Sequence, residues 1–525
     1  MHERDLRDLD ADAEAGAAAT TKAAGGAGGG VPDTPGGVPD TPGGVPDTPD
    51  PRPDARRWWA LPVITLAQLM LVLDGTIVNI ALPSMQADLG MSDADRQWAV
   101  TAYVLAFGGT LLLGGRISGM AGHRRTFAVS LVGFAAASAL GGAATGAGTL
   151  FAARALQGLF AAAMAPAALS LLTLTFTDPR DRGRAFGVFG AMSAAGSGVG
   201  LLAGGLLTEY LDWRWCLWVN IPIAAVALLG IPYLHRDTPR SDSGRLDVPG
   251  ALLSALGVAA LVYGLTEAEP RGWDDPFVLA LLAGGALLLA VFAAVEARTR
   301  DPLLPLRVVR HRARGGAFLI SGLMMASLFG CFLFLSYYTQ TVLGYSPVEA
   351  GLTIMVLVAG SLVGSLLLAA RLLTRVAPRT LMVPGLLAMA AGLLLLSRLS
   401  ADSSHVMAGY LVPAQLLVGT GLGVVLTSAT SLATADVGFA DMGTASATFN
   451  AAQQIGGAVG TALFNTVATT SAAAYLRAHQ GADTADGTVH GFGAALLVSA
   501  GIMLAAASAA ALMTGTRSAD KDSGR

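Results

Sequence analysis

The feature that most constrains this chain is a series of apolar stretches, each about 18–25 residues long, that starts at Trp58 and recurs toward the C-terminus. An α-helix of that length crosses the ~30 Å hydrocarbon core of a bilayer. The pattern predicts fourteen transmembrane helices, at residues 59–82, 97–117, 126–147, 149–172, 185–207, 215–234, 248–267, 276–296, 315–338, 350–370, 380–400, 406–432, 443–469 and 491–514.

Composition supports a membrane protein and excludes most soluble classes. Hydrophobic residues make up 53% of the 525 positions and charged residues only 13%, with a mean hydropathy of +0.58. Soluble domains average ~25% charged residues, so this chain cannot cover a globular surface with ionic groups. A soluble enzyme, a nucleic-acid-binding protein and a disordered scaffold are therefore poor fits, and no nucleic-acid partner is expected.

Arginine is distributed unevenly between the loops on the two sides of the predicted spans. Eighteen arginines fall in the loops on one side and five in the loops on the other. Short loops rich in arginine stay in the cytoplasm. The count therefore predicts an even number of spans with both termini in the cytoplasm.

The chain is predicted to divide into five parts. A Pro- and Gly-rich beginning with three VPDTP repeats has no means of forming a core and is expected to be a disordered arm. The arginine-rich loop after the second span is similar to the loop after the tenth, which favours two related six-helix bundles separated by two inserted helices. The expected parts are the arm 1–54, an N-terminal bundle 55–234, the inserted helices with a cytoplasmic linker 235–314, a C-terminal bundle 315–514 and a tail 515–525.

Two ionisable side chains lie well inside the predicted spans, Asp74 in the first and Arg154 in the fourth. A charge at the centre of a transmembrane helix costs about 2.5–3.5 kcal/mol, so such residues mark function by default. Their distances from the outer span ends place both at similar depth, and we expect them to pair. The functional interpretation is a proton switch, in which Asp74 binds and releases a proton as Arg154 moves. The alternative is an ion pair that only joins two helices.

Small and polar residues inside the spans supply weaker candidates. Gly196, Gly200 and Gly204 recur at every fourth position of the fifth span, a spacing that permits close helix packing or a hinge. Polar residues could line a central cavity for substrate or make hydrogen bonds between helices. These cavity candidates are Asn79, Gln157, Tyr337, Tyr338, Asn450 and Gln453.

Several kinds of chemistry have no residues to carry them. A phosphate-binding loop of the form GxxxxGK[ST] is missing, since Lys22 is followed by alanine and Lys521 by aspartate. The isolated cysteines Cys216 and Cys331 are expected to be buried thiols, and no histidine falls inside a span. We therefore expect neither an enzyme nor a metal or cofactor site.

The residues resemble the major facilitator superfamily, specifically its fourteen-span drug:proton antiporter branch. The resemblance covers essentially everything after residue 55. The matching motifs are residues 73–83 (LDGTIVNIALP), 154–158 (RALQG), 213–215 (WRW), 220–222 (NIP), 296–307 (EARTRDPLLPLR) and 115–125 (GRISGMAGHRR). The implied fold is an all-α polytopic membrane protein with two six-helix bundles, two additional central helices and both termini in the cytoplasm.

The resemblance also implies site residues. It assigns proton coupling to Asp74 and Arg154, and gating to a set comprising Gly115, Arg116, Gly122, Arg124, Arg125, Gly196, Gly200, Gly204 and Gly205. Two positions depart from the family pattern. Gly119 stands where aspartate is usual in the inner-loop motif, and Leu201 stands where proline is usual in the fifth-span motif.

The function that follows is export of an amphiphilic drug or antibiotic across the bacterial cytoplasmic membrane, driven by the proton gradient without a cofactor. The expected partners are a small amphiphilic substrate, protons and the lipid bilayer, with the protein acting as a monomer. One alternative is a transporter of an endogenous lipid or metabolite, including an importer. Another is a non-transporting membrane scaffold that works through the Pro-rich arm, whose deletion an exporter should survive.

Overall fold

The computed structural model describes residues 55–237, 247–299, 302–399, 405–435, 437–479 and 483–514. Within these ranges all regular secondary structure is helical. The chain divides into two units, Met1–Pro53 and Asp54–Arg525, and all described residues belong to the second. The predicted arm and the predicted tail both lie outside the described residues.

The first part of the helical unit carries nine α-helices. They begin after a 3₁₀ turn at Ala55–Trp59 (η1), and a second 3₁₀ turn at Ile231–Tyr233 (η2) follows α7. The helices are α1 (Ala60–Leu89), α2 (Asp93–Ala121), α3 (His123–Gly142), α4 (Ala147–Thr175), α5 (Pro179–Tyr210), α6 (Trp215–Trp218), α7 (Asn220–Leu229), α8 (Val248–Arg271) and α9 (Pro276–Glu296).

The second part begins with a short helix and includes three π-helical turns. These turns, at Tyr338–Val342 (η3), Val363–Ala369 (η4) and Met407–Leu411 (η5), lie within the predicted spans or at their ends. The α-helices are α10 (Leu306–Arg310), α11 (Arg312–Tyr337), α12 (Pro347–Leu362), α13 (Ala370–Leu372), α14 (Pro378–Leu396), α15 (Val412–Ala433), α16 (Phe439–Ala478) and α17 (Thr484–Met513).

All fourteen predicted spans coincide with helix. Twelve of the described helices are long and apolar enough to cross a membrane. The other two predicted spans are the shorter apolar helix Trp215–Leu229, formed by α6 and α7, and the 40-residue helix α16. These helices confirm the prediction of an all-α polytopic membrane protein. Helices suit a bilayer because each one satisfies its backbone hydrogen bonds internally. The number fourteen and the cytoplasmic placement of both termini stay predictions.

Short polar side chains followed by proline set where several helices begin. Asp178 precedes α5 and accepts hydrogen bonds from the backbone N–H groups of Arg180 and Asp181. Asp275 caps α9 in the same way. Ser346 and Glu349 form a reciprocal capping box at the start of α12. Each device satisfies backbone donors that the first helical turn leaves without an intrahelical acceptor.

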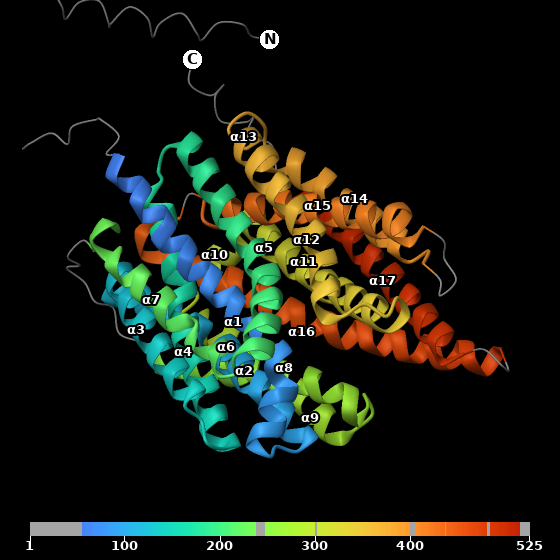
Figure 1. Cartoon of the computed structure of the whole chain (residues 1–525). Coiled ribbons are helices and arrows are strands. Elements are labelled where there is room, and N and C mark those ends of the chain that lie inside the picture. The colour runs from blue at the N-terminus through green and yellow to red at the C-terminus, as the bar shows by residue number, and fades with distance from the viewer. Residues whose placement is uncertain are drawn as a thin grey trace, which may run out of the picture. The chain divides into compact units, whose positions relative to one another are not determined.

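The helices pack in two groups along the sequence (Figure 1). In the first, α1 packs on α5 while α2 and α3 pack on α4; in the second, α11 packs on α16 and α17, and α14 on α15. The pair α8 and α9 pack on each other, and α8 contacts one helix of each group, α2 and α16. The residue boundaries predicted for the bundles and for the inserted pair stay predictions.

Some contacts between the two groups join the ends that the arginine count places in the cytoplasm, while α5 also packs on α12 closer to their other ends. A methyl group added to Gly115 on α2 would lie 2.5 Å from the side chain of Ala447 on α16. The Ser170 hydroxyl on α4 lies 3.4 Å from the Ser446 hydroxyl on α16. Such close approach leaves no open path between the groups at these contacts.

Candidate functional site

The two predicted intramembrane charges are in direct contact. The Arg154 Nη1 atom donates to Asp74 Oδ2 at 2.7 Å, so α4 is joined to α1. Asp74 is 0% and Arg154 1% exposed. The contact that their matched depth predicts is therefore present, while their role in proton coupling stays a prediction. Because α1 continues to Leu89, beyond the predicted end at residue 82, Asp74 lies at the middle of its helix.

Three further polar side chains complete a buried network around this pair. Gln157 Nε2 donates to Asp74 Oδ1 at 3.0 Å, and Asn220 Nδ2 donates to the same oxygen at 2.8 Å. Gln157 also donates to Ser138 Oγ at 2.7 Å and accepts from Arg154 at 2.8 Å. The Asp74 carboxylate thus accepts from three side chains on α4 and α7, the pattern that suits its ionised form.

Arg154 is held on two further sides. Its Nε donates to the Ala99 carbonyl at 3.0 Å, and its guanidinium carbon lies 4.5 Å from the centre of the Tyr103 ring. Both partners are on α2. A guanidinium placed over an aromatic face gains electrostatic stabilisation that is larger when water is excluded. The arginine therefore links α2 to the acid on α1.

Apolar side chains surround the network. On the side of the predicted outer ends, a buried cluster includes Leu73, Ile77, Leu150 and Leu217. The much larger main core begins on the other side with residues such as Met70. Water is therefore excluded from the ion pair in this conformation, which strengthens the attraction and raises the cost of leaving either charge alone.

The glycines of the fifth span pack against the helix that carries Asp74. A methyl group on Gly196 would lie 2.9 Å from Val72, one on Gly204 would lie 3.0 Å from the Ile77 carbonyl, and one on Gly200 would overlap Thr76. Gly205 is half-buried beside this stripe. The spacing thus serves close packing of α5 on α1; whether it also acts as a hinge stays a prediction.

The predicted gating loop is built around an acid from a distant segment. Asp237 accepts from the backbone N–H groups of Arg124 at 3.0 Å and Arg125 at 3.1 Å. It therefore caps the start of α3. Gly122 has φ +99°, and a methyl group there would collide with this carboxylate. Arg116 is half-buried, and its Nε has no hydrogen-bond partner among the described residues.

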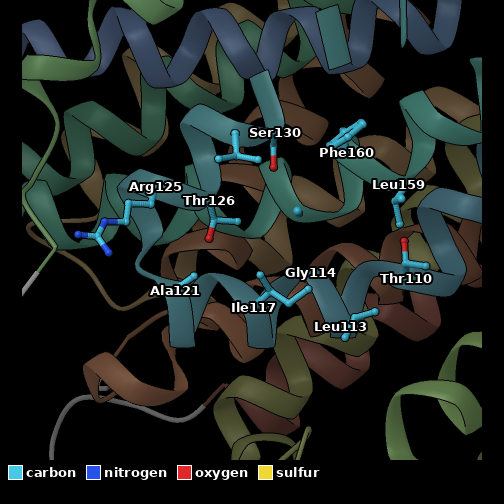
Figure 2. Close-up of a pocket in the computed structure, with 12 residues that line it drawn as sticks. Thr110, Leu113, Gly114, Ile117, Ala121, Arg125, Thr126, Ser130, Leu159 and Phe160 are labelled. Carbon is cyan, nitrogen blue, oxygen red and sulfur yellow. The ribbon is translucent and has the colours of Figure 1, made fainter. Parts of the chain in front are cut away.

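An apolar pocket of about 330 Å³ lies beside that loop (Figure 2). Its walls come from α2, α3 and α4, with Arg125 at one end and Thr110 and Leu113 toward the other. Asp74 and Arg154 do not line it, and neither does any residue of the second helix group. The pocket is therefore separate from the buried network and from the surface between the groups.

The cavity candidates are scattered rather than convergent. Gln157 is buried in the network, and Tyr338 is buried against Phe334 in the core, so neither lines open space in this conformation. Tyr337 packs on Phe492. The amide nitrogens of Asn79 and Asn450 bond to carbonyls of their own helices. Gln453 on α16 is half-buried. Their role in substrate binding stays a prediction.

The family is decided by sequence comparison. Residues 64–461 match the model of the Major Facilitator Superfamily. The chain belongs to the Major Facilitator Superfamily. As a member, it is a multi-pass transporter of the bacterial cytoplasmic membrane. Its fold is similar to that of the human organic anion transporter MFSD10, with a TM-score of 0.62, 16% identity and coverage of 86% of this chain and 99% of the other.

Two curated relatives of this superfamily member are similar over most of their length. The chain is 56% identical to the puromycin resistance protein of Streptomyces alboniger over 471 residues, 89% of this chain and 93% of the relative. It is 38% identical to the cephamycin export protein of Amycolatopsis lactamdurans over 428 residues, 80% of this chain and 88% of the relative.

Sequence reasoning missed three residues of this superfamily member's site. Asn220 belongs to the motif at residues 220–222, but the sequence gives no sign that its side chain contacts Asp74. Ser138 and Asp237 carry no signal in the sequence, because a single serine in a span and a single acid in a loop are common. Among the described residues, no group of three potential metal-binding side chains comes together.

Proposed function

We propose that this protein exports amphiphilic antibiotics across the cytoplasmic membrane in exchange for protons, and that Asp74 is the residue that carries the proton. The observation that carries the proposal is the fully buried pair of Asp74 and Arg154. Apolar packing would join two helices without the cost of removing two charges from water. A buried charge pair between spans is therefore best explained by a task that needs a change of charge.

The mechanism follows from the donors on Asp74. In this conformation the carboxylate oxygens accept from Arg154, Gln157 and Asn220, and these donors stabilise the charged carboxylate. Proton uptake therefore becomes more favourable when Arg154 or an amide donor withdraws. Because the three donors lie on α4 and α7 while the acid lies on α1, relative movement of these helices changes the proton affinity of the acid.

The energy available is sufficient for export. One charge that crosses a membrane potential of 100 mV releases about 2.3 kcal/mol, which sustains a concentration ratio of several tens. Coupling requires that proton binding and substrate binding favour opposite-facing conformations. The contacts of Gly115 with α16 and of Ser170 with Ser446 support an assignment of this conformation as closed on the cytoplasmic side.

The relatives supply the first compounds to test. One relative carries a name that assigns it to puromycin resistance, and another to cephamycin export. Because the first is 56% identical over nearly the whole chain, we propose puromycin or a compound of similar amphiphilic character as the cargo. The monomeric state and the exchange of protons belong to the same proposal.

The experiment compares wild type with Asp74→Asn in a pump-deficient bacterial host at matched membrane expression. We expect wild type to confer resistance to puromycin and to lower its accumulation, and a protonophore to abolish the effect. Asp74→Asn should lose both. Asp88→Asn is the matched control, because Asp88 is on the same helix and is exposed.

Full resistance in Asp74→Asn would remove this acid from the mechanism while keeping export. If wild type protects against no compound in a broad panel, the antibiotic assignment fails. The endogenous-cargo alternative would then be tested by metabolite profiling.

A further inference from the structure

A second buried acid lies far from the network, where the two helices α8 and α9 meet the linker that follows them. Glu296 is the last residue of α9 and is 3% exposed. Its Oε2 accepts a hydrogen bond from the Leu304 backbone N–H at 2.9 Å. The glutamate therefore fixes the linker to the end of α9.

The same linker is fixed to the second helix group. The Leu303 carbonyl accepts from the Thr444 hydroxyl on α16 at 3.3 Å. The Leu303 side chain is buried in a cluster with Leu112 of α2, Phe292 of α9 and Ala447 of α16. Glu296 and Leu303 thus connect α9, α2 and α16 at one place.

A second carboxyl group faces Glu296. Asp247 caps α8, and its Oδ1 accepts from the Gly250 backbone N–H at 3.0 Å. Its other oxygen, Oδ2, and Glu296 Oε1 both point at Gly250. A methyl group added to that glycine would lie 2.5 Å from Asp247 Oδ2 and 2.6 Å from Glu296 Oε1. Both oxygens are buried, and neither has a hydrogen-bond donor among the described residues.

No described cation neutralises this pair. Charged residues toward the same end of the neighbouring segments are Arg116 on α2, Arg298 just after α9, Arg307 and Arg310 of α10, and Asp441 on α16, which pairs with Arg307. None of these donates a hydrogen bond to Asp247 or Glu296. Arg245, Arg300 and Asp301 lie outside the described residues.

Two buried acceptor oxygens that face each other without a donor repel, because both carry negative charge in water-excluded surroundings. A single proton between them removes one charge and supplies the missing donor. We propose that Asp247 and Glu296 share one proton, forming a second proton site in this transporter that is separate from Asp74.

The surroundings decide which oxygen carries the proton. Asp247 sits at the N-terminus of α8, where backbone N–H groups and the helix dipole favour a negative charge. Glu296 is the more buried acid, so it holds the proton and donates through Oε1 to Asp247 Oδ2. Its Oε2 stays free to accept from Leu304.

The shared proton has a mechanical consequence. Its loss leaves two like charges beside Gly250 and pushes the end of α9 away from the start of α8. Because Glu296 also holds Leu304, the linker loosens on α16 at the same time. The pair therefore makes the connection between the inserted helices and the second helix group sensitive to pH.

Infrared difference spectroscopy on the purified full chain tests this directly, because a protonated carboxyl group has a carbonyl stretching band that the carboxylate lacks. We expect a titrating band that disappears in Glu296→Gln and remains in Asp74→Asn. Glu267→Gln is the matched control, since Glu267 pairs with Arg271 at the other end of α8. A spectrum unchanged by Glu296→Gln overturns the proposal.

Thermal unfolding as a function of pH supplies a second measurement that needs no transport assay. Wild-type stability should fall as the pH rises, because the folded state holds a proton that the unfolded chain releases. Glu296→Gln should remove this dependence, since its amide permanently donates to Asp247 and its oxygen still accepts from Leu304. A stability that depends on sodium or potassium instead of pH would identify a cation site and overturn the shared proton.

Discussion

The Asp74 carboxylate on α1 and the Arg154 guanidinium on α4 lie 2.7 Å apart, although 80 residues separate them in the chain. Neither side chain is more than 1% exposed. Removal of one partner therefore leaves the other as a buried, uncompensated charge. Loss of transport in a single variant can therefore come from loss of the proton-carrying group or from destabilisation by the unpaired charge.

Arg154→Gln should lower the free energy of unfolding by about 3–5 kcal/mol, the range for removal of one partner from a buried ion pair. The double variant Asp74→Asn with Arg154→Gln should recover most of this loss, because no net charge remains buried. Transport in proteoliposomes should stay absent in both. Thermal unfolding of the purified proteins gives the stabilities. If the double variant loses as much stability as the two single variants do together, the two residues are not coupled.

Asn220→Ala should lower the rate of proton-driven transport. The substitution removes a 2.8 Å hydrogen bond between α7 and Asp74, which leaves the buried carboxylate with two of its three donors. Transport rates of wild type and variant are measured in proteoliposomes at fixed proton gradient and membrane potential. Gln340→Ala is the control, since its exposed amide bonds to Ser336 four residues earlier. An unchanged rate in Asn220→Ala would show that this hydrogen bond is not needed for coupling.

The all-helical fold was largely predictable from the sequence because the length and hydropathy of a span are local properties. Each apolar stretch became helix, and the burial cost of a charge identified Asp74 and Arg154 in advance. Their contact followed from a depth comparison alone, which needs only the helical rise.

The rest could not be predicted, because it depends on how helices rotate and pack. Asn220 reaches Asp74 only because α7 lies against α1 and turns one face toward it. Asp237 caps α3 across more than a hundred residues of chain, and Asp247 meets Glu296 through the pairing of α8 and α9. Helix ends also extended past the apolar stretches, as α1 does at Leu89, because hydropathy stops at the membrane while backbone hydrogen bonding does not.

Gly115→Ala should disfavour closure between the two helix groups. The added methyl group would lie 2.5 Å from Ala447, closer than carbon atoms pack, so α2 and α16 must separate. Spin labels at the exposed positions Thr177 and Arg375, after replacement of both native cysteines, should report a larger share of long distances. Gly148→Ala is the control, because nothing lies within 4 Å of the added carbon. Identical distance distributions would place the closing contact elsewhere.

Asp237→Ala should destabilise the protein by about 0.5–2 kcal/mol, the usual cost of losing a helix cap. Its carboxylate accepts from the N–H groups of Arg124 and Arg125, and without it these donors at the start of α3 lose their acceptor. Asp237→Asn should cost less, because an amide oxygen still accepts a hydrogen bond. Midpoints of thermal unfolding rank the stabilities of wild type, Asp237→Asn and Asp237→Ala. Asp274→Ala is the control, because Asp274 is an exposed acid. Equal midpoints for wild type and Asp237→Ala would mean that water replaces the cap, and that Gly122 is required by its φ of +99° rather than by the acid.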